Sequence, residues 1–254
     1  DLAMAVDDNP FTLRGKTILI TGASSGIGRS IALECSKLGA VLFLTARNEE
    51  RLKETLSQCE GEDHQYLVAD LTKEDDIERL VAALPILDGI VLCAGRGLFL
   101  PFKFSTREKF DSVFNINFFS PIETLRLLVK KKKLSKGCSV VFMDSIGGTS
   151  KFAVGNSIYG ASKAALNSMI KFCALELSSN LIRVNGICPG MVETPLIHYG
   201  KLTQEQLDAD MAEYPLKRYG QPKDIAFGAI YLLSEASSWM TGQSLVIDGG
   251  ITIK

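Results

Sequence analysis

The chain has 254 residues, of which 46% are hydrophobic, and its formal net charge is −1. This length suits one large α/β domain with a sizeable core, and a charge near zero argues against a general attraction to nucleic acid or to a membrane. Six scattered cysteines and two histidines predict reduced thiols, no metal site and a cytoplasmic protein. No apolar run reaches the roughly 18 residues of a membrane span.

The polar, acidic residues 1–10 do not resemble a signal peptide and are expected to form a flexible leader. The first expected element, a buried strand over 16–21, runs into a glycine-rich turn and an amphipathic helix that ends at Gly39. A second strand, 40–45, completes a βαβ unit. Glycines at this junction let the backbone approach a pyrophosphate, and the helix N-terminus offers unpaired N–H groups. We therefore expect a dinucleotide site, rather than a bare strand–helix turn, at Gly22, Ser24, Ser25, Gly26, Ile27 and Gly28.

The end of the second strand bears on the choice of dinucleotide. A carboxylate there would bind the ribose hydroxyls of NAD and repel a 2′-phosphate. The chain instead has Arg47 followed by Asn48, and no acid before Glu49. A guanidinium at this place can pair with a phosphate and stack on adenine. The alternative is an exposed arginine that starts a helix.

Helices and strands alternate through the middle of the chain. A helix that starts at Asn48, Glu49 and Glu50 and continues over 51–59 is expected first. A strand over 65–69, a helix over 73–84 and a strand over 88–93 follow in turn. Asp70 and Leu71 follow the first of these strands, and Ala94 and Gly95 follow the second. Asp70 is also a candidate cap for the helix that comes next.

The longest helical pattern covers 106–131, and Asn117 interrupts its apolar face. An asparagine on the buried face of a helix needs a partner or a purpose. Its neighbour Asn115 is expected to face solvent. At the end of this helix, Lys130 to Lys133 and Lys136 form a basic run, which is either a solvated helix terminus or a docking patch for an acidic carrier protein or a phosphorylated substrate.

The chain is organised around the stretch 145–163. A strand over 139–143 leads to Ser145, a loop rich in Gly and Ser follows, and Tyr159 and Lys163 then lie four residues apart at the start of a helical pattern. Residues with this spacing are neighbours on one helix face. A phenol beside an ammonium group is a plausible acid/base device because the positive charge lowers the phenol pKa. Tyr219 and Lys223 share the spacing, but Gly220 and Pro222 oppose a helix there.

After a helix that ends near Ser179, a strand over 181–187 leads to Pro189 and Gly190. The polar segment near 191–219, which includes Thr194, His198 and Tyr199, is expected to be a substrate lid of one or two short helices. A last long helix and a strand over 244–247 complete the chain. The alternation predicts a single-domain α/β fold over 11–254. This is a doubly wound parallel sheet of Rossmann type, with about seven strands, helices on both faces and ligands at the strand carboxyl ends.

The spacing Gly-x-x-x-Gly-x-Gly after Thr21, together with Ser145 and Tyr-x-x-x-Lys, resembles the short-chain dehydrogenase/reductase family from about Gly15 to Gly250. The resemblance implies NADP(H) as cofactor, with Arg47 at the extra phosphate. It implies a catalytic group of Asn117, Ser145, Tyr159 and Lys163, and further cofactor contacts at Asp70, Leu71, Ala94, Gly95, Pro189, Gly190 and Thr194. Relatives usually have Asn where this chain has Cys93, which we interpret as a small buried residue rather than a nucleophile.

The implied activity is NADPH-dependent reduction of a ketone or aldehyde, with Tyr159 as general acid. Length and the C-terminal segment are most similar to the β-ketoacyl carrier-protein reductases, so an acyl carrier protein is a candidate partner. Those enzymes usually have Arg where this chain has Leu175, which leaves a carbonyl, sugar or steroid reductase open. A non-catalytic NADP sensor and a sugar-nucleotide epimerase or dehydratase are less favoured. Relatives form tetramers or dimers, so a homo-oligomer, in particular a homotetramer, is expected.

Overall fold

A computed structural model describes residues 9–194 and 203–254 of the chain. Most of the expected leader, and His198 and Tyr199 of the expected lid, lie outside these ranges. Pro10 accepts a backbone hydrogen bond from Ala236, 3.0 Å long, so the chain is tied to the body of the protein from this point on.

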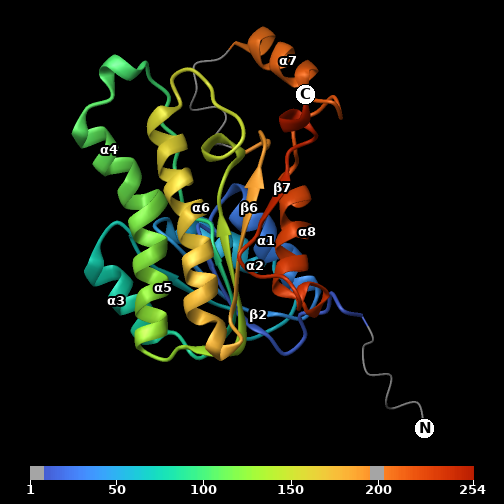
Figure 1. Cartoon of the computed structure of the whole chain (residues 1–254). Helices are drawn as coiled ribbons and strands as arrows, with labels where there is room; N and C mark the ends of the chain where they lie inside the picture. Colours follow the sequence, from blue (N-terminus) through green and yellow to red (C-terminus); the bar gives the residue numbers. More distant parts are fainter. Residues whose placement is uncertain (1–8, 195–202) are drawn as a thin grey trace.

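The described residues form a seven-stranded parallel sheet in the order β3-β2-β1-β4-β5-β6-β7. Helices cover both faces (Figure 1), so the expected doubly wound α/β fold is confirmed. The strands are β1 (Thr17–Thr21), β2 (Val41–Ala46), β3 (Gln65–Val68), β4 (Leu87–Leu92), β5 (Leu134–Met143), β6 (Arg183–Pro189) and β7 (Ser244–Ile247). The long helices are α1 (Gly26–Lys37), α2 (Glu49–Ser57), α3 (Glu74–Ala83), α4 (Arg107–Phe114), α5 (Ser120–Lys130), α6 (Ser157–Leu177), α7 (Gln204–Glu213) and α8 (Pro222–Leu233).

Two apolar clusters lie on opposite faces of the sheet. One joins α1 and α8 to β1 and β2, and the other joins α3, α5 and α6 to β4 and β5. Figure 1 shows the same division, with α1 and α8 on one side and α3, α5 and α6 on the other. Strands buried on both faces read as nearly continuous apolar runs, which is why their sequence pattern is short and unbroken.

The strand order reverses between β1 and β4, and a ligand crevice forms beyond the carboxyl ends of strands at such a point. Thr21, the last residue of β1, holds the two strand ends together. Its Oγ1 accepts hydrogen bonds from the backbone N–H of Cys93, at 2.9 Å, and of Ala94, at 3.1 Å. The half-buried Cys93 thus contributes its backbone N–H to the link between β1 and β4. Burial raises the pKa of its thiol to about 12, and because only the thiolate is a good nucleophile, this agrees with a non-nucleophilic role.

The expected helix over 106–131 is divided by a π-helical turn, Asn115–Phe119, between α4 and α5. Pro121 lies in the first turn of α5 and has no N–H to continue an α-helical ladder. The Ser120 hydroxyl instead donates to the carbonyl oxygens of Asn115, at 2.7 Å, and of Leu71. Turns of this kind often occur at functional sites, and this one carries Asn117.

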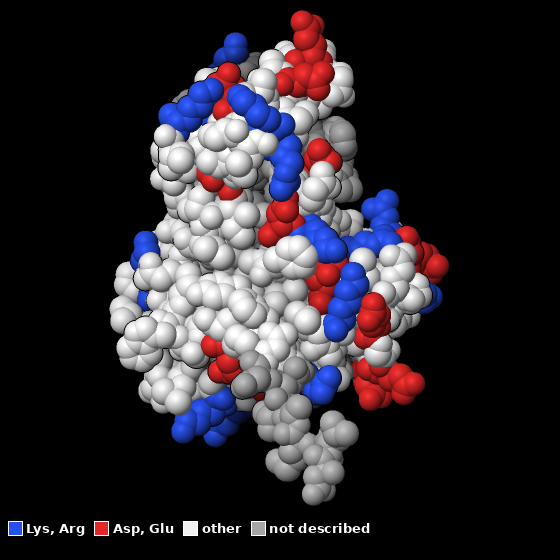
Figure 2. All heavy atoms as spheres, turned by 90° about the vertical axis from the view of Figure 1, so that its right-hand side faces the viewer, with Lys and Arg blue, Asp and Glu red and all other residues white. Residues whose placement is uncertain are grey.

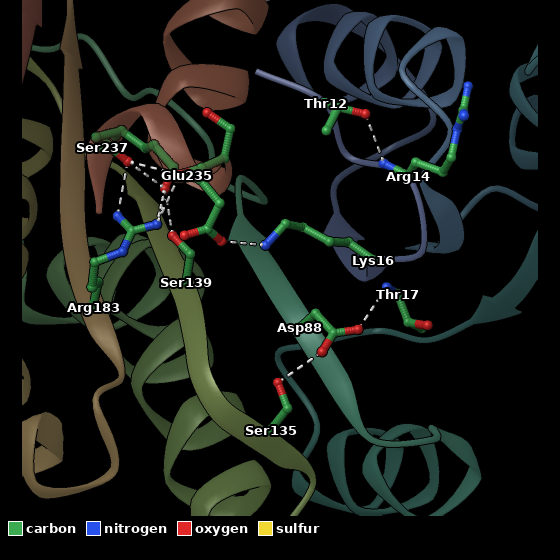
Figure 3. Close-up of polar contacts among 12 residues, drawn as sticks. Thr12, Arg14, Lys16, Thr17, Asp88, Ser135, Ser139, Arg183, Glu235 and Ser237 are labelled. Atoms are coloured by element: carbon green, nitrogen blue, oxygen red, sulfur yellow. Dashed lines mark hydrogen bonds and ion pairs between the residues drawn. The ribbon is translucent and has the colours of Figure 1, made fainter. Parts of the chain in front are cut away.

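At the opposite edge of the sheet, Arg183 ties β6 to the end of α8 (Figure 3). Its guanidinium donates to the carbonyl oxygens of Leu232, at 2.9 Å, and Ser234, at 3.2 Å, and to Ser237 Oγ, at 2.9 Å. Burial lowers the pKa of Arg183 from its ordinary value. The same view shows the ion pair between Lys16, which directly precedes β1, and Glu235, which follows α8.

We expect Arg183→Met to lower the free energy of unfolding by about 1–3 kcal/mol, because buried oxygen atoms lose their charged donor. In a domain of this size, that corresponds to a fall in Tm of roughly 3–10 °C. Arg107→Met, which removes the exposed ion pair with Asp111, is the control and should leave Tm nearly unchanged, because solvent screens such a pair. Equal Tm values for the two variants in a thermal melt would contradict the role given to Arg183.

Candidate active site

Tyr159 and Lys163 both lie near the start of α6, as the helical spacing predicts. Lys163 is 5% exposed, and its Nζ donates a 2.6 Å hydrogen bond to the carbonyl oxygen of Met143, near the end of β5. The same Nζ is 5.8 Å from the centroid of the half-buried Tyr159 ring. The ammonium group is therefore held under the phenol by the end of the neighbouring strand.

Ser145 approaches Tyr159 across a turn of glycines. The Ser145 Oγ accepts a 3.0 Å hydrogen bond from the N–H of Gly147. A Cβ placed on Gly147 would lie 3.3 Å from that Oγ and 3.7 Å from Tyr159 Cε1. A Cβ on Gly148 would lie 2.5 Å from the backbone nitrogen of Ala164. A side chain at position 148 would collide with the backbone of α6, whereas one at position 147 would fit only if the neighbouring side chains moved by a few tenths of an ångström. The loop therefore packs directly on α6 and keeps the serine close to the tyrosine.

Asn117 joins this group from the π-helical turn. It is 1% exposed, its Oδ1 accepts from the N–H of Arg96 at 2.9 Å, and its Nδ2 donates to the Arg96 carbonyl at 3.0 Å and to Ser162 Oγ at 3.1 Å. A Cβ on Gly95 would lie 3.1 Å from Asn117 Oδ1 and 3.8 Å from Lys163 Nζ. Asn117, Lys163 and the loop after β4 therefore meet at one place.

Asn115 does not face solvent as expected. It is half-buried, and its Nδ2 donates a 3.3 Å hydrogen bond to the carbonyl oxygen of Thr72. The π-helical turn shifts the side-chain directions, so an assignment of faces from α-helical periodicity fails for this residue.

The glycine-rich turn follows β1 as expected. A Cβ on Gly28 would lie 2.3 Å from the Gly22 carbonyl oxygen, and Gly22 (φ 68°) and Gly26 (φ 53°) have left-handed backbones that favour glycine. Ser25 caps α1 with extended backbone, and its side chain makes no capping hydrogen bond to the described residues. The turn thus combines close backbone packing with N–H groups at a helix start, which is the cradle that a pyrophosphate needs.

Arg47 follows β2 directly and is exposed at the same edge of the sheet. Asn48 caps α2, and its Oδ1 accepts a 2.9 Å hydrogen bond from the Arg51 N–H, so the side chain of Arg47 is not needed to start the helix. Partial burial raises the pKa of Asp70, but hydrogen bonds from Thr72 and the charge of Arg47 more than offset this and hold that pKa below its ordinary value. The Asp70 side chain bonds to Thr72, whereas Lys73 is the residue at the cap position of α3.

Pro189 ends β6, and Gly190 follows it at the same edge as the glycine-rich turn. A Cβ on Gly190 would lie 3.0 Å from Asp248 Cα, so the turn packs tightly against the residue that follows β7. Thr194 is half-buried and is the last residue described before 203. Its contact with a cofactor stays a prediction.

Of the expected lid, the structure describes α7 and the segment that leads to α8. The acidic residues of α7 lie at the top of the molecule (Figure 2) and comprise Glu205, Asp208, Asp210 and Glu213. The Tyr219 hydroxyl donates to Asp210 at 2.8 Å, and α8 begins only at Pro222. Tyr219 and Lys223 therefore do not share a helix, which confirms that their spacing is accidental.

A buried carboxyl group, that of Asp144, lies beside the site although the sequence patterns do not point to it. Asp144, 2% exposed, directly precedes Ser145. Its Oδ2 accepts from Asn167 Nδ2 at 2.7 Å and from Cys188 Sγ at 3.4 Å, while Oδ1 is buried with no hydrogen-bond partner in the described ranges. Burial raises the pKa of Asp144, against the opposing effects of the Asn167 bond and the Lys163 charge.

This pKa direction predicts how stability depends on pH. The pKa of Asp144 is higher in the folded protein than in the unfolded chain, where it is about 3.9. Its contribution to stability is therefore fully present below about pH 3.9, where the acid is protonated in both states, and is lost as pH rises through the folded-state pKa. We expect Asp144→Asn to match the wild type at low pH and to become more stable than it as pH rises. Thermal melts of both proteins from about pH 4 to about pH 8 measure the difference. Asp75→Asn, at an exposed site, is the control, and a difference for Asp144→Asn that does not grow with pH would contradict the argument.

The fold and this edge of the sheet together define a nucleotide-binding oxidoreductase of Rossmann type. A family model described as enoyl-(acyl carrier protein) reductase matches residues 22–252. The chain belongs to the short-chain dehydrogenase/reductase family.

Individual relatives cover nearly the whole chain. It is 36% identical over 242 residues to a 3-oxoacyl-[acyl-carrier-protein] reductase of Rickettsia bellii, which covers 94% of this chain and 98% of that protein. It is 33% identical over 257 residues to a glucose 1-dehydrogenase of Gluconobacter oxydans, with 94% and 92% covered. Among solved structures, the RhlG/NADP active-site complex of Pseudomonas aeruginosa superposes with a TM-score of 0.87 at 31% identity and covers 96% of this chain and 99% of that one.

Proposed function

We propose that the protein is an NADPH-dependent reductase that converts a ketone or aldehyde to an alcohol. The observation that carries the proposal is the meeting of Ser145, Tyr159, Lys163 and Asn117 at the carboxyl edge of the sheet, beside the switch point. An acid, a carbonyl-orienting hydroxyl and a cation within one group suit proton transfer to a developing alkoxide.

Each side chain has a separate task in this proposal. Tyr159 donates the proton to the carbonyl oxygen, and Ser145 hydrogen-bonds and orients that oxygen. Lys163, fixed by the Met143 carbonyl, stabilises the phenolate that Tyr159 leaves behind. Asn117 holds the loop at Arg96 in place and supports the path by which the proton is replaced.

The cradle at Gly22 and Gly28 fits a dinucleotide, and a nicotinamide cofactor bound there would supply the hydride. Arg47 and the absence of an acid before Glu49 support NADP(H) over NAD(H). A solved relative that is described as an NADP complex agrees with this choice. Asp70, Leu71, Ala94, Gly95, Pro189, Gly190 and Thr194 are proposed to complete the cofactor site.

The two similar enzymes differ in substrate, so the candidates are a 3-oxoacyl thioester and a sugar or other carbonyl compound. Leu175 on α6 is 75% exposed, where carrier-protein reductases usually have an arginine. This favours a small-molecule carbonyl substrate over docking of an acyl carrier protein at α6. The basic run at Lys130 remains the alternative surface for such a carrier.

We further propose a homo-oligomer. Phe172 and Leu175 on α6 are 56% and 75% exposed, and Phe227 on α8 is 52% exposed. The face that bears α8 has a broad central area without charged side chains (Figure 2). Apolar patches of this kind mark contact surfaces.

No helix within the described ranges is long and apolar enough to cross a membrane.

The test is a matched assay of NADPH and NADH oxidation against acyl-thioester, sugar, steroid and simple ketones. We expect turnover of at least one ketone class and a lower KM for NADPH than for NADH. Cofactor binding without turnover across the whole panel would support a non-catalytic sensor instead. Exchange at a sugar-nucleotide carbon without net oxidation of NADPH would support an epimerase.

A further inference from the structure

Asp144 has no task in the proposed reaction, although both of its neighbours in the chain have one. Ser145 orients the substrate carbonyl in that proposal, and the carbonyl oxygen of Met143 accepts the hydrogen bond that fixes Lys163. Asp144 is 2% exposed, so its carboxyl group is shielded from solvent. A buried ionisable group at this point of the chain can act on both neighbours.

The peptide bond between Met143 and Asp144 joins strand β6 to Lys163. Its N–H, that of Asp144, donates to the Ile187 carbonyl of β6 at 2.8 Å. Its C=O, that of Met143, accepts from Lys163 Nζ at 2.6 Å. The N–H and C=O of a trans peptide lie in one plane and point in opposite directions. The orientation of this single peptide therefore determines where the ammonium group is held.

The Asp144 side chain fastens the same point of the chain to α6. Its Oδ2 accepts a 2.7 Å hydrogen bond from Asn167 Nδ2, which also donates to Ser244 Oγ of β7 at 2.8 Å. Asn167 follows Lys163 by four residues, so the two side chains are neighbours on one face of α6. Two hydrogen bonds, one helical turn apart, therefore hold α6 against the end of β5, and Asp144 accepts the second of them.

This arrangement has a cost in stability. Asp144 Oδ1 is buried without a hydrogen-bond partner among the described residues, and burial raises the pKa of the carboxyl group. Two titratable groups in the described ranges act on it. The charge of Lys163 favours the carboxylate, and Cys188 of β6 stays a neutral donor because burial and the charge of Asp144 raise its pKa to about 12. Proteins sacrifice stability mainly at functional positions, so a task for Asp144 is expected.

We propose, building on the reductase function above, that Asp144 is a positioning residue for the reduction. Its carboxylate binds Asn167 of α6 and keeps the preceding peptide in the orientation that holds Lys163. The same attachment keeps Ser145, the next residue along the chain, in place beside the phenol. Hydrogen bonds to an ionised group are roughly twice as strong as neutral ones, which is why a carboxylate suits this task better than an amide.

The test measures kcat, and KM for NADPH, with the ketone that the wild type reduces fastest. Asp144→Ala removes the acceptor, and kcat should fall about 10–100-fold because a catalytic group misplaced by about 1 Å can lose about 100-fold in rate. Asp144→Asn keeps an acceptor oxygen and should restore kcat to within about fivefold of the wild type. KM for NADPH should change far less than kcat, because the expected pyrophosphate cradle follows β1, two strands away from β5.

A double-variant cycle tests the route through Asn167. Asn167→Ala alone should lower kcat by a factor similar to that of Asp144→Ala. The double variant should be no slower than the slower single variant, because both substitutions remove the same hydrogen bond. Independent effects would multiply instead, and that result would overturn the route through Asn167.

Asp88→Ala is the matched control for a loss of stability. Asp88 is half-buried near the start of β4, away from the carboxyl edge of the sheet, and accepts from the Thr17 N–H at 3.0 Å and from Ser135 Oγ at 2.8 Å (Figure 3). This variant should lower Tm and leave kcat unchanged, whereas Asp144→Ala should lower kcat even well below its Tm.

The outcomes separate the two proposals. Wild-type kcat in Asp144→Ala, or an equal fall of kcat in Asp88→Ala, would overturn the positioning role while the reductase function stands. If the wild-type protein reduced no ketone, the proposed function would fall, and the task of Asp144 with it.

Discussion

Replacement of Tyr159 by phenylalanine should abolish nearly all turnover while NADPH still binds. The variant keeps the ring that packs beside Ser145 and Lys163 and loses only the hydroxyl. General acid catalysis contributes about 10²–10⁴-fold to such reactions, so kcat should fall by at least that range. Steady-state assays give kcat, and the fluorescence of bound NADPH gives the affinity.

The matched control is Tyr231→Phe on α8. Tyr231 packs against Phe11, with ring centroids 6.4 Å apart, on the face of the sheet away from α6. This variant should retain wild-type kcat, KM and NADPH affinity. If Tyr159→Phe turned over ketones at the normal rate, the phenol would not be the acid, and the proposed mechanism would be wrong.

Replacement of Arg47 by leucine should reduce the preference for NADPH over NADH by about 10–100-fold. A charge-assisted hydrogen bond to a phosphate contributes roughly 1.5–3 kcal/mol, and every 1.4 kcal/mol corresponds to about a tenfold change in affinity. Because Arg47 is exposed, its loss should not lower Tm appreciably. Dissociation constants for the two cofactors, measured by calorimetry, give the ratio directly.

Arg51→Leu is the control for this experiment. Arg51 carries the same charge, is exposed, and lies in the first turn of α2, where its backbone N–H donates to Asn48 Oδ1. It should change both affinities by a similar, small factor. An equal NADPH:NADH ratio in Arg47→Leu and the wild type would show that another group binds the 2′-phosphate, or that NAD(H) is the cofactor.

Local features of the site could be predicted because they depend on short-range geometry. Tyr159 and Lys163 share a helix face, and the glycine-rich turn joins a strand to a helix, so spacing alone places them. Element boundaries were less accurate. The strand expected over 139–143 begins at Leu134, because Leu134 pairs with Leu87 of β4 across a register shift that leaves no local signal.

Other parts of the site needed the packed structure. The sequence pattern predicts a solvent-facing Asn115, because nothing near this residue indicates the π-helical turn, which depends on Pro121 and on the hydrogen bonds of Ser120. Asp144 and Asn156 likewise carry no local signal in the sequence. Asn156 in particular resembles an ordinary helix cap in the sequence, and only the structure shows that its side chain makes no capping bond and that its Oδ1 has no hydrogen-bond partner among the described residues.

The amino-acid sequence by itself determined the order of strands and helices, the dinucleotide turn and the tyrosine–lysine pair, because periodicity and turn chemistry act over a few residues. The tertiary structure alone decided which distant groups meet. Asn117 is brought to Lys163 beside Gly95, and Asn156 to Ser145 across Gly147, by packing between loops and helices far apart in the chain. Burial of a polar atom, and the lack of a partner for it within residues 9–194 and 203–254, are properties of that packing, so the Oδ1 of Asn156 stands out only in the folded protein.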